Sequence, residues 1–194
     1  MKTLATCVAR GGVRSIVITI GIVAIGASVT RAQDYFVDQR NDGFTPGTYY
    51  SIPLNEPIGQ EFTPSLDHVD VVDLYISAQV QTLIQLLIHE GTIHGDVIGG
   101  ATTDVVWPTA PPARFEFASS VELVPGELYV IEVQADSQCF LGVAPAQTDP
   151  YSGGDLIIVG HVYNGFDAWF REGVWDVSSA QMSTWGAIKA LYER

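Results

Sequence analysis

The segment His89-Glu90-Gly91-Thr92-Ile93-His94 contains the residue types of a zinc-protease site. In the HExxH motif two histidines four residues apart lie on one helical face and converge on the metal. Here the histidines are five residues apart, which turns the second about 140° around a helix from the first. Gly91 and the β-branched Thr92 and Ile93 also disfavour a helix. The segment is therefore predicted to be the end of a strand followed by a turn.

Several aspartates are placed so that they could lend oxygen ligands to a calcium ion. Asp34, Asp38 and Asp42 are four residues apart, unlike the one-residue alternation of an EF-hand loop. Near the ends of predicted strands, hard oxygen ligands are available at Asp67, Asp70, Asp155 and Asp167. A structural calcium ion is the one cofactor that these residues suggest.

The chain lacks the motifs of nucleophilic catalysis. Cys139 lies in the apolar run CFLGVA, where it is expected to pack as a small hydrophobic side chain. There is no GxSxG turn, no phosphate-binding loop and no complete histidine cluster. A glycosidase needs two carboxylates about 5–10 Å apart, and the 22 acidic residues leave such a pair open. The sequence predicts a protein that is not an enzyme, with a glycoside-acting enzyme as an alternative.

Aromatic residues offer a second kind of chemistry, because flat rings hold sugars by CH–π stacking beside hydrogen-bonding side chains. The aromatic candidates are Trp107, Tyr151, Tyr163, Trp169 and Trp175. Their polar neighbours in sequence are Asp155, Asn164, Asp167 and Arg171. The residues predicted to bind a ligand are Trp107, Tyr151, Trp169 and Arg171. Each ring could instead pack in the core, since aromatic side chains carry a large apolar area.

Residues 1–32 are predicted to be a secretory signal peptide. Lys2, Arg10 and Arg14 form a basic start, the 14-residue apolar run Ile16–Val29 follows, and Thr30-Arg31-Ala32 offers small residues before a cleavage site. The apolar run is short for a membrane span of about 20 residues. We expect export to the cell surface or the exterior, with no transmembrane segment after cleavage.

Cleavage after Ala32 would leave a strongly acidic chain. It removes four of the nine basic residues and no acidic one, so five basic residues face 22 acidic ones, a net charge of −17. Such a surface repels nucleic acid and anionic lipid, and it suits divalent cations or simple solubility outside a cell. Cys7 leaves with the signal peptide, so Cys139 has no partner for an internal disulfide.

The remaining chain predicts an all-β domain over residues 33–177. In VELVPGELYVIEV (121–133) a Pro-Gly turn precedes an alternating run, with Tyr129, Ile131 and Val133 on one face, which predicts a hairpin. Other predicted strands are Tyr49–Ile52, Gly59–Pro64, Val69–Ser77, Thr82–Glu90, Thr102–Trp107, Arg114–Ala118, Cys139–Ala144, Asp155–Gly160, His161–Tyr163 and Asp167–Arg171. Their spacing is typical of an antiparallel two-sheet sandwich.

The tail, residues 178–194, differs in its pattern. Trp185, Ile188 and Leu191 recur every three residues, which predicts a short amphipathic helix. Alternatively the tail packs a single tryptophan on the sandwich. A third reading is a sorting tag, since STWGAIKALYER looks like the short C-terminal tails of some exported bacterial proteins.

The order of several motifs resembles a known kind of domain. The motifs are GQEFTPSLDHVDVVDLYISA, RFEFASSVELVPGELYVIEV, DPYSGGDLIIV and FDAWFR. Between Gly59 and Gly173 they are similar to a domain of exported bacterial proteins that often carry C-terminal sorting signals. The resemblance implies a jelly-roll β-sandwich shaped like carbohydrate-binding modules, without a settled activity. Trp169 stands where that family has a small outward residue, so an exposed aromatic ring is expected there.

Three functions are consistent with these patterns. The first is a non-catalytic exported binding or adhesion module, whose partner would be a polysaccharide or a surface component. The second is a purely structural surface protein with no small ligand, and the third is the glycoside-acting enzyme. Fold similarity by itself does not establish sugar binding, and the oligomeric state is left open.

Overall fold

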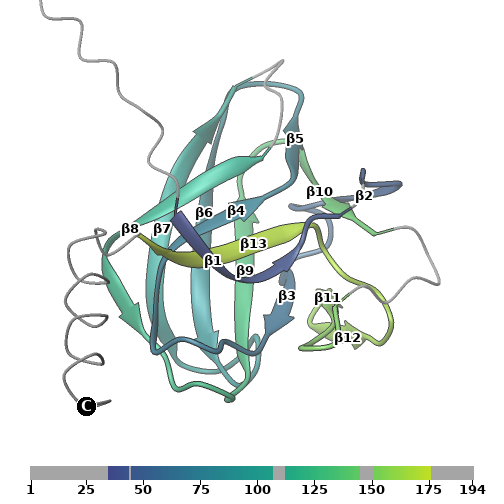
Figure 1. The fold of residues 1–194 in the computed structure, drawn as a ribbon. Helices are drawn as coiled ribbons and strands as arrows, with labels where there is room; N and C mark the ends of the chain where they lie inside the picture. Colours follow the sequence, from purple (N-terminus) through teal and green to yellow (C-terminus); the bar gives the residue numbers. More distant parts are fainter. Residues whose placement is uncertain (1–34, 44, 107–111, 145–150, 176–194) are drawn as a thin grey trace, which may run out of the picture. The chain divides into compact units, whose positions relative to one another are not determined.

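The computed structural model describes residues 35–43, 45–106, 112–144 and 151–175. The predicted signal peptide, Asp34, Trp107 and the predicted C-terminal helix and sorting tag lie outside these residues. Within them, all regular structure is antiparallel β-strand and there is no helix, so the prediction of an all-β antiparallel protein is confirmed (Figure 1). The described part likewise contains no helix long and apolar enough to cross a membrane.

The strands form three sheets. The four-stranded sheet has the order β1 (Tyr35–Asn41), β13 (Phe170–Trp175), β4 (His68–Leu74), β8 (Ala113–Glu122). The three-stranded sheet has the order β2 (Thr48–Ser51), β10 (Cys139–Val143), β5 (Ile76–Ala78). The six-stranded sheet has the order β12 (His161–Tyr163), β11 (Leu156–Ile158), β3 (Ile58–Phe62), β9 (Tyr129–Ala135), β6 (Thr82–Glu90), β7 (Val97–Val105).

All three sheets contribute to one hydrophobic core. Strand residues point alternately to opposite faces, and one set from most strands enters this cluster, β1 and β12 being the exceptions. Its largest fully buried side chains include Phe115 and Phe170 from the four-stranded sheet, Leu141 from the three-stranded sheet, and Phe62 and Ile131 from the six-stranded sheet. Residues that alternate with these point away from the core, and they form the surfaces considered below.

Most predicted strands and faces are confirmed. The predicted face of Val72, Leu74 and Ile76 is buried in the core, and Tyr129, Ile131 and Val133 share the core face of β9. The histidine segment is a strand end and a turn, because His89 is in β6 and no helix follows it. Cys139 is fully buried, as expected, and burial raises the pKa of its thiol to about 11.

The predicted hairpin at 121–133 is wrong. Val121 belongs to β8, which pairs with β4, whereas Tyr129 begins β9, which pairs with β3 and β6. The Pro-Gly connection therefore crosses from one sheet to another instead of folding a strand back on its neighbour. Both strands present apolar residues to the same core, so an alternating pattern on each side of a turn arises without pairing between them.

One strand was not predicted, and the bounds of two others differ from prediction. The polar segment before Tyr49 contains β1, an edge strand that pairs only with β13. β7 begins at Val97 and includes Gly99, where a Cβ would lie 2.4 Å from Val121 Cγ2, so glycine allows β7 to approach β8 closely. The last strand runs from Phe170 to Trp175 rather than ending at Arg171. In each case pairing with neighbouring strands determines where the strand lies, because the local sequence pattern is weak.

The turn between β11 and β12 holds a strained residue. Val159 has φ 52° and Gly160 has φ 72°, the left-handed pair of a type I′ hairpin, where Asn-Gly is favoured and a β-branched residue is unfavourable. We predict that Val159→Asn raises the free energy of unfolding by about 1 kcal/mol, measured by urea denaturation. Val162→Asn, at a similarly exposed site within β12, should not stabilise. Equal effects of the two changes would contradict this reading of the turn.

Candidate functional site

Three arginines and one aspartate lie in a single row across the four-stranded sheet. The strand register places Arg40 of β1 opposite Arg171 of β13, Arg171 opposite Asp73 of β4, and Asp73 opposite Arg114 of β8. Their chain neighbours Leu74 and Phe170 are core residues, so by strand alternation the row lies on the sheet face that points away from the core.

Asp73 is the anchor of this row, because its carboxylate is fully buried and collects several donors. Arg114 Nε donates to Asp73 Oδ1 at 2.9 Å and Arg114 Nη2 donates to Oδ2 at 3.2 Å. The Tyr35 hydroxyl donates to Oδ2 at 2.9 Å, and Arg171 Nη2 lies 3.5 Å from the same oxygen. Charged donors on both carboxylate oxygens compensate its removal from water.

Aromatic rings flank the guanidinium groups on both sides. The Arg114 guanidinium lies 5.1 Å from the centre of the Tyr35 ring, and that of Arg171 lies 5.1 Å from the centre of the Trp169 ring. Such cation–π contacts stabilise a guanidinium and fix its plane. Beyond them, Tyr35 packs edge-on against Trp175.

The aromatic series continues past Trp169 toward the three-stranded sheet. Tyr75 packs edge-on against Trp169 at 6.0 Å between ring centres, and Tyr49 lies 6.1 Å from Tyr75. Gly142 of β10 pairs with Tyr49 and donates its N–H to the Tyr75 carbonyl. A Cβ on Gly142 would lie 3.0 Å from the Tyr75 ring, so glycine leaves room for the two tyrosines to meet.

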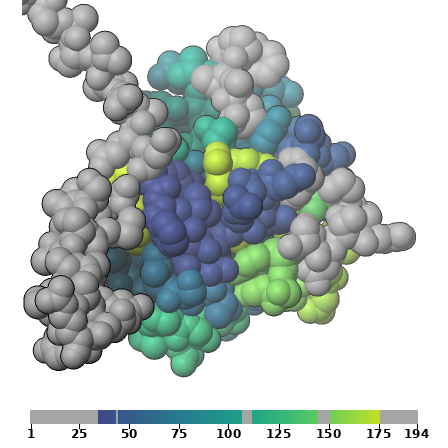
Figure 2. All heavy atoms as spheres, in the orientation of Figure 1, coloured from purple at the N-terminus to yellow at the C-terminus, as the bar shows by residue number. Residues whose placement is uncertain are grey.

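We call this surface the arginine–aromatic ladder. Its members, in spatial order, are Trp175, Tyr35, Arg114, Asp73, Arg171, Trp169, Tyr75 and Tyr49, with Arg40 beside Arg171. Figure 2 shows β1 in purple and part of β13 in yellow at the surface on this side.

The ladder also concentrates the positive charge of the described chain. The described residues contain three arginines and no lysine, and all three arginines belong to this row. Asp42 lies 3.7 Å from Arg40 and 3.6 Å from Arg171. The hydrogen bonds to Asp73 raise the pKa of Arg114, and burial, then the charge of Asp73, raises the pKa of the Tyr35 phenol. The guanidinium groups therefore stay charged and the phenol neutral in ordinary buffers.

Two of the predicted ligand-binding residues, Trp169 and Arg171, meet in the ladder, and Trp175 joins its far end. The expected exposure of Trp169 is wrong, because the side chain is only 7% exposed. It does point outward, as the sequence pattern indicated, but Arg171 and Tyr75 cover the ring and its Nε1 donates to the Asp42 carbonyl.

The other predicted ligand-binding residues lie elsewhere. Tyr151 is buried, packs edge-on against Phe170, and its hydroxyl accepts a hydrogen bond from the Thr63 N–H. Trp107 lies outside the described residues. Tyr163 is exposed on β12, at the edge of the six-stranded sheet. Of the described rings, Tyr151 and Tyr163 do not share a surface with Trp169.

The four aspartates considered as calcium ligands are each engaged in hydrogen bonds. Asp67 contacts the His68 ring, Asp70 accepts from Ser120 and the Trp175 N–H, Asp155 accepts from the Gly165 N–H, and Asp167 accepts from Gln60. Among the described residues there is no group of three or more His, Cys, Asp or Glu side chains arranged to hold a metal ion. The calcium ion stays a prediction from the sequence.

His89 of the histidine segment has a structural partner. Its Nε2 lies 2.6 Å from Glu132 Oε2 and its Nδ1 lies 3.1 Å from the Gly95 carbonyl. Gln134 donates to the second oxygen of Glu132 at 2.9 Å. His89 and Glu132 are both buried. Their contacts connect the β6–β7 turn to β9.

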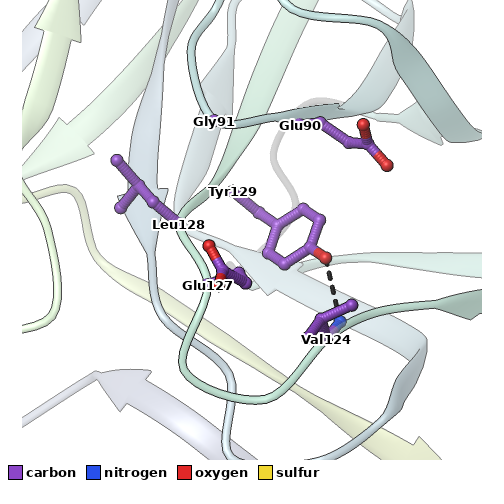
Figure 3. Close-up of a pocket in the computed structure, with 6 residues that line it drawn as sticks. All are labelled: Glu90, Gly91, Val124, Glu127, Leu128 and Tyr129. Atoms are coloured by element: carbon purple, nitrogen blue, oxygen red, sulfur yellow. Dashed lines mark hydrogen bonds between the residues drawn. The ribbon is translucent and has the colours of Figure 1, made fainter.

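Two hollows complete the candidate surfaces. One, about 300 Å³, lies at the end of β6 and beside the β8–β9 connection, and is lined by Glu90, Gly91, Val124, Glu127, Leu128 and Tyr129 (Figure 3). The Tyr129 hydroxyl accepts the Val124 N–H there. The other, about 140 Å³, is lined by Leu83, Gln85, Thr102, Gln134, Ala135 and Asp136. Neither hollow includes an arginine or an exposed aromatic ring, which leaves the ladder as the best-developed site.

Sequence reasoning missed Tyr35, Asp73 and Arg114 as members of the site. Asp73 and Arg114 were placed only as outward positions of strands, and Tyr35 lay in a segment without a predicted strand. The signal that could have found this row is the small number of arginine and lysine residues, because Arg40, Arg114 and Arg171 are the only ones between Ala32 and Lys189.

A charge-removing change at Asp73 tests the anchor. Asp73→Asn keeps the shape but withdraws the negative charge beneath Arg114 and Arg171, so we predict a loss of about 3 kcal/mol or more in unfolding free energy. Urea denaturation measures it. Asp104→Asn, at an exposed position of β7, should change stability by less than about 0.5 kcal/mol. A loss at Asp73 as small as this control would show that the carboxylate does not hold the row together.

Glu172 supplies a pH test of the packing beneath the ladder. It is fully buried, and burial, then the charge of Asp38, raises its pKa from 4.5 to about 9. Between these pH values the folded chain holds a proton that the unfolded chain lacks, so stability falls as pH rises, by up to about 1.4 kcal/mol per unit.

We therefore predict that Glu172→Gln, which cannot ionise, gains stability relative to the parent chain as the pH rises from 5 to 8. Denaturation at several pH values measures the difference. Glu122→Gln, at an exposed position of β8, is the control. A difference between the Glu172 variant and the parent that stays constant across this range would mean that Glu172 is not protonated in the folded protein.

Comparison of the sequence with protein-family models and with curated proteins found no match. No activity or ligand is therefore transferred from a relative, and the function has to be inferred from the residues of the ladder.

Proposed function

We propose that this chain is an exported, non-catalytic binding or adhesion module whose partner is a polysaccharide of a cell surface or matrix. The observation that carries this proposal is the arginine–aromatic ladder, in which rings, guanidinium groups and a carboxylate are ordered on one face. Protein surfaces that hold extended polar ligands combine aromatic area with a few fixed hydrogen-bonding groups. A ladder that spans two sheets offers such groups along a line, which suits a linear polymer.

The proposal includes a finer description of the fold, a jelly-roll-type β-sandwich. The chain passes repeatedly between sheets, since β3 and β9 lie in the six-stranded sheet, β4 and β8 in the four-stranded, and β5 and β10 in the three-stranded, while β7 follows β6 and β12 follows β11 within the six-stranded sheet. This alternation around one core is the connectivity that jelly rolls use. The flat face of a sandwich sheet would then present the ladder, as expected if the fold has the shape of carbohydrate-binding modules, which the resemblance to exported bacterial domains implies.

The non-catalytic part of the proposal rests on the chemistry of the ladder. Arginine is not a practical proton donor or acceptor near neutral pH, and the Asp73 carboxylate is enclosed by its donors. Asp38 and Glu172 are two carboxyl groups that interact electrostatically, but Glu172 is fully buried. A general acid must contact its substrate, so this association is a poor candidate for glycoside cleavage.

Tyr49 provides the direct test, because its ring is 43% exposed at one end of the ladder. We predict that Tyr49→Ala weakens polysaccharide binding about threefold to tenfold, the range expected for losing one aromatic contact. Pull-downs on insoluble cellulose, chitin and xylan, together with a glycan array, measure binding. Trp169→Ala is unsuitable, since removal of this buried ring would also disturb folding.

Tyr163→Ala is the matched control, since Tyr163 is the same residue type, 44% exposed, on a different sheet. It should leave binding unchanged. Binding lost in the Tyr163 variant and kept in the Tyr49 variant would move the site to β12. Absence of binding to every polysaccharide, with self-association of the folded chain, would favour a purely structural surface protein instead.

A further inference from the structure

The ring faces of the ladder are largely occupied. Arg171 and Tyr75 cover Trp169, and Arg114 and Trp175 contact Tyr35. Tyr49 at one end is the most exposed ring of the ladder, and Trp175 at the other end is half-buried, so these ends are where a neutral sugar could stack on a ring. What the ladder presents along the rest of its length is guanidinium, with side-chain exposures of 68% for Arg40, 29% for Arg171 and 34% for Arg114.

Arg171 has hydrogen-bonding capacity that the described residues do not fill. Its nearest carboxylate oxygens lie 3.6 Å from Nε, on Asp42, and 3.5 Å from Nη2, on Asp73. These are long ion pairs. The Nε has no hydrogen-bond partner within the described chain but is buried, so a ligand would meet the other guanidinium atoms of this 29% exposed side chain. Arg114 differs, because two of its nitrogens donate to Asp73 at 2.9 and 3.2 Å.

The partner that best matches an oriented guanidinium is a carboxylate. The planar fork of arginine donates two parallel hydrogen bonds to the two oxygens of a carboxylate, which ammonium and hydroxyl groups cannot do. Trp169 holds the plane of Arg171, so little orientation is lost on binding. Arg40 is on the adjacent strand, about 4.8 Å away at the backbone, and adds a second, flexible donor group.

The charge distribution points in the same direction. Two carboxylates, those of Asp42 and Asp73, contact the three guanidinium groups, and the charge of Glu116 also acts on Arg114. The chain as a whole carries a net charge of −13 before any cleavage, so an acidic polymer is repelled by most of the surface. All arginines of the described residues belong to the ladder, so it is the place where an acidic polymer would meet fixed guanidinium groups, which would fix where the polymer binds.

We infer that the ligand of the ladder is an acidic polysaccharide bearing uronic-acid carboxylates, and that Arg171 binds a carboxylate of the polymer with Arg40 assisting. This inference rests on the proposed polysaccharide-binding function and narrows it to one ligand class. Arg114 stays engaged with Asp73 and positions the row. The aromatic rings orient the arginines instead of contacting most of the sugar units.

Binding to polygalacturonate and to its fully methyl-esterified form tests the ligand class, because esterification removes the charge and keeps the backbone. Dextran sulfate and dextran distinguish carboxylates from other anions. Isothermal calorimetry on the full secreted chain should show binding to polygalacturonate and at least tenfold weaker binding to the ester. It should also show weakening with added salt, since salt screens the ion pairs.

Arg171→Gln should weaken polygalacturonate binding tenfold or more, as expected for hydrogen bonds to a charged group. Arg171→Lys, which retains charge but not the fork, should recover only part of the loss. Arg40→Gln, at a more exposed site whose change leaves folding intact, should weaken binding severalfold. Gln85→Glu alters net charge by the same amount as Arg171→Gln but lies in the hollow of the six-stranded sheet, and it should have no effect.

Each other outcome has a definite meaning. Equal binding of the acid and the ester, unaffected by Arg171→Gln, would overturn the inference and leave the polysaccharide-binding function standing. Equal losses in the Gln85→Glu and Arg171→Gln variants would reduce the effect to overall charge and also overturn it. Preference for dextran sulfate over polygalacturonate would reject the uronic-acid class. Failure to bind any of the polymers or the neutral polysaccharides above would overturn both proposals.

Discussion

A buried carboxylate on an outward-facing strand position is the constraint on which the ladder depends. Asp73 is fully buried although it points away from the core, so its charge must be compensated by groups on the neighbouring strands. Arg114, Arg171 and Tyr35 provide that compensation from β8, β13 and β1. An uncompensated buried charge would cost several kcal/mol. The carboxylate thus requires donor side chains on the strands at both sides of β4. The Tyr35 and Trp169 rings then hold the guanidinium groups in one orientation.

The strand register converts this local requirement into an extended surface. Because Arg40, Arg171, Asp73 and Arg114 are opposite one another in four adjacent strands, charges that are far apart in sequence form one line. A register shift of one residue in β13 would bury Arg171 and expose Phe170. The core therefore protects the ladder, since the same alternation that buries Phe170, Leu74 and Phe115 holds the charged row outside.

The features of the fold and the ladder that could be predicted are those encoded within a short segment of the sequence. Alternation within a strand identified the faces of Val72, Leu74 and Ile76 and of Tyr129, Ile131 and Val133 correctly, because period two is visible in a short segment. Pairing partners are not local, which is why residues 121–133 resembled a hairpin although β8 and β9 lie in different sheets. Trp169 was correctly placed outward, yet its cover comes from Arg171 and Tyr75, whose contacts depend on the register. Tyr35 could not be connected to Asp73, 38 residues away, without knowing that β1 and β4 flank β13.

The outward faces of the two larger sheets solve the burial of polar groups in different ways, and this difference bears on function. On the six-stranded sheet, His89 and Glu132 satisfy each other within a closed pair, completed by Gln134 and the Gly95 carbonyl. On the four-stranded sheet, the compensation of Asp73 leaves Arg171 with only long ion pairs and a partly exposed side chain, and Arg40 is mostly exposed. A closed network only stabilises, because it has no remaining capacity for another partner. An open network of fixed charges retains that capacity, and for this reason we propose the four-stranded sheet, rather than the six-stranded one, as the ligand-binding face.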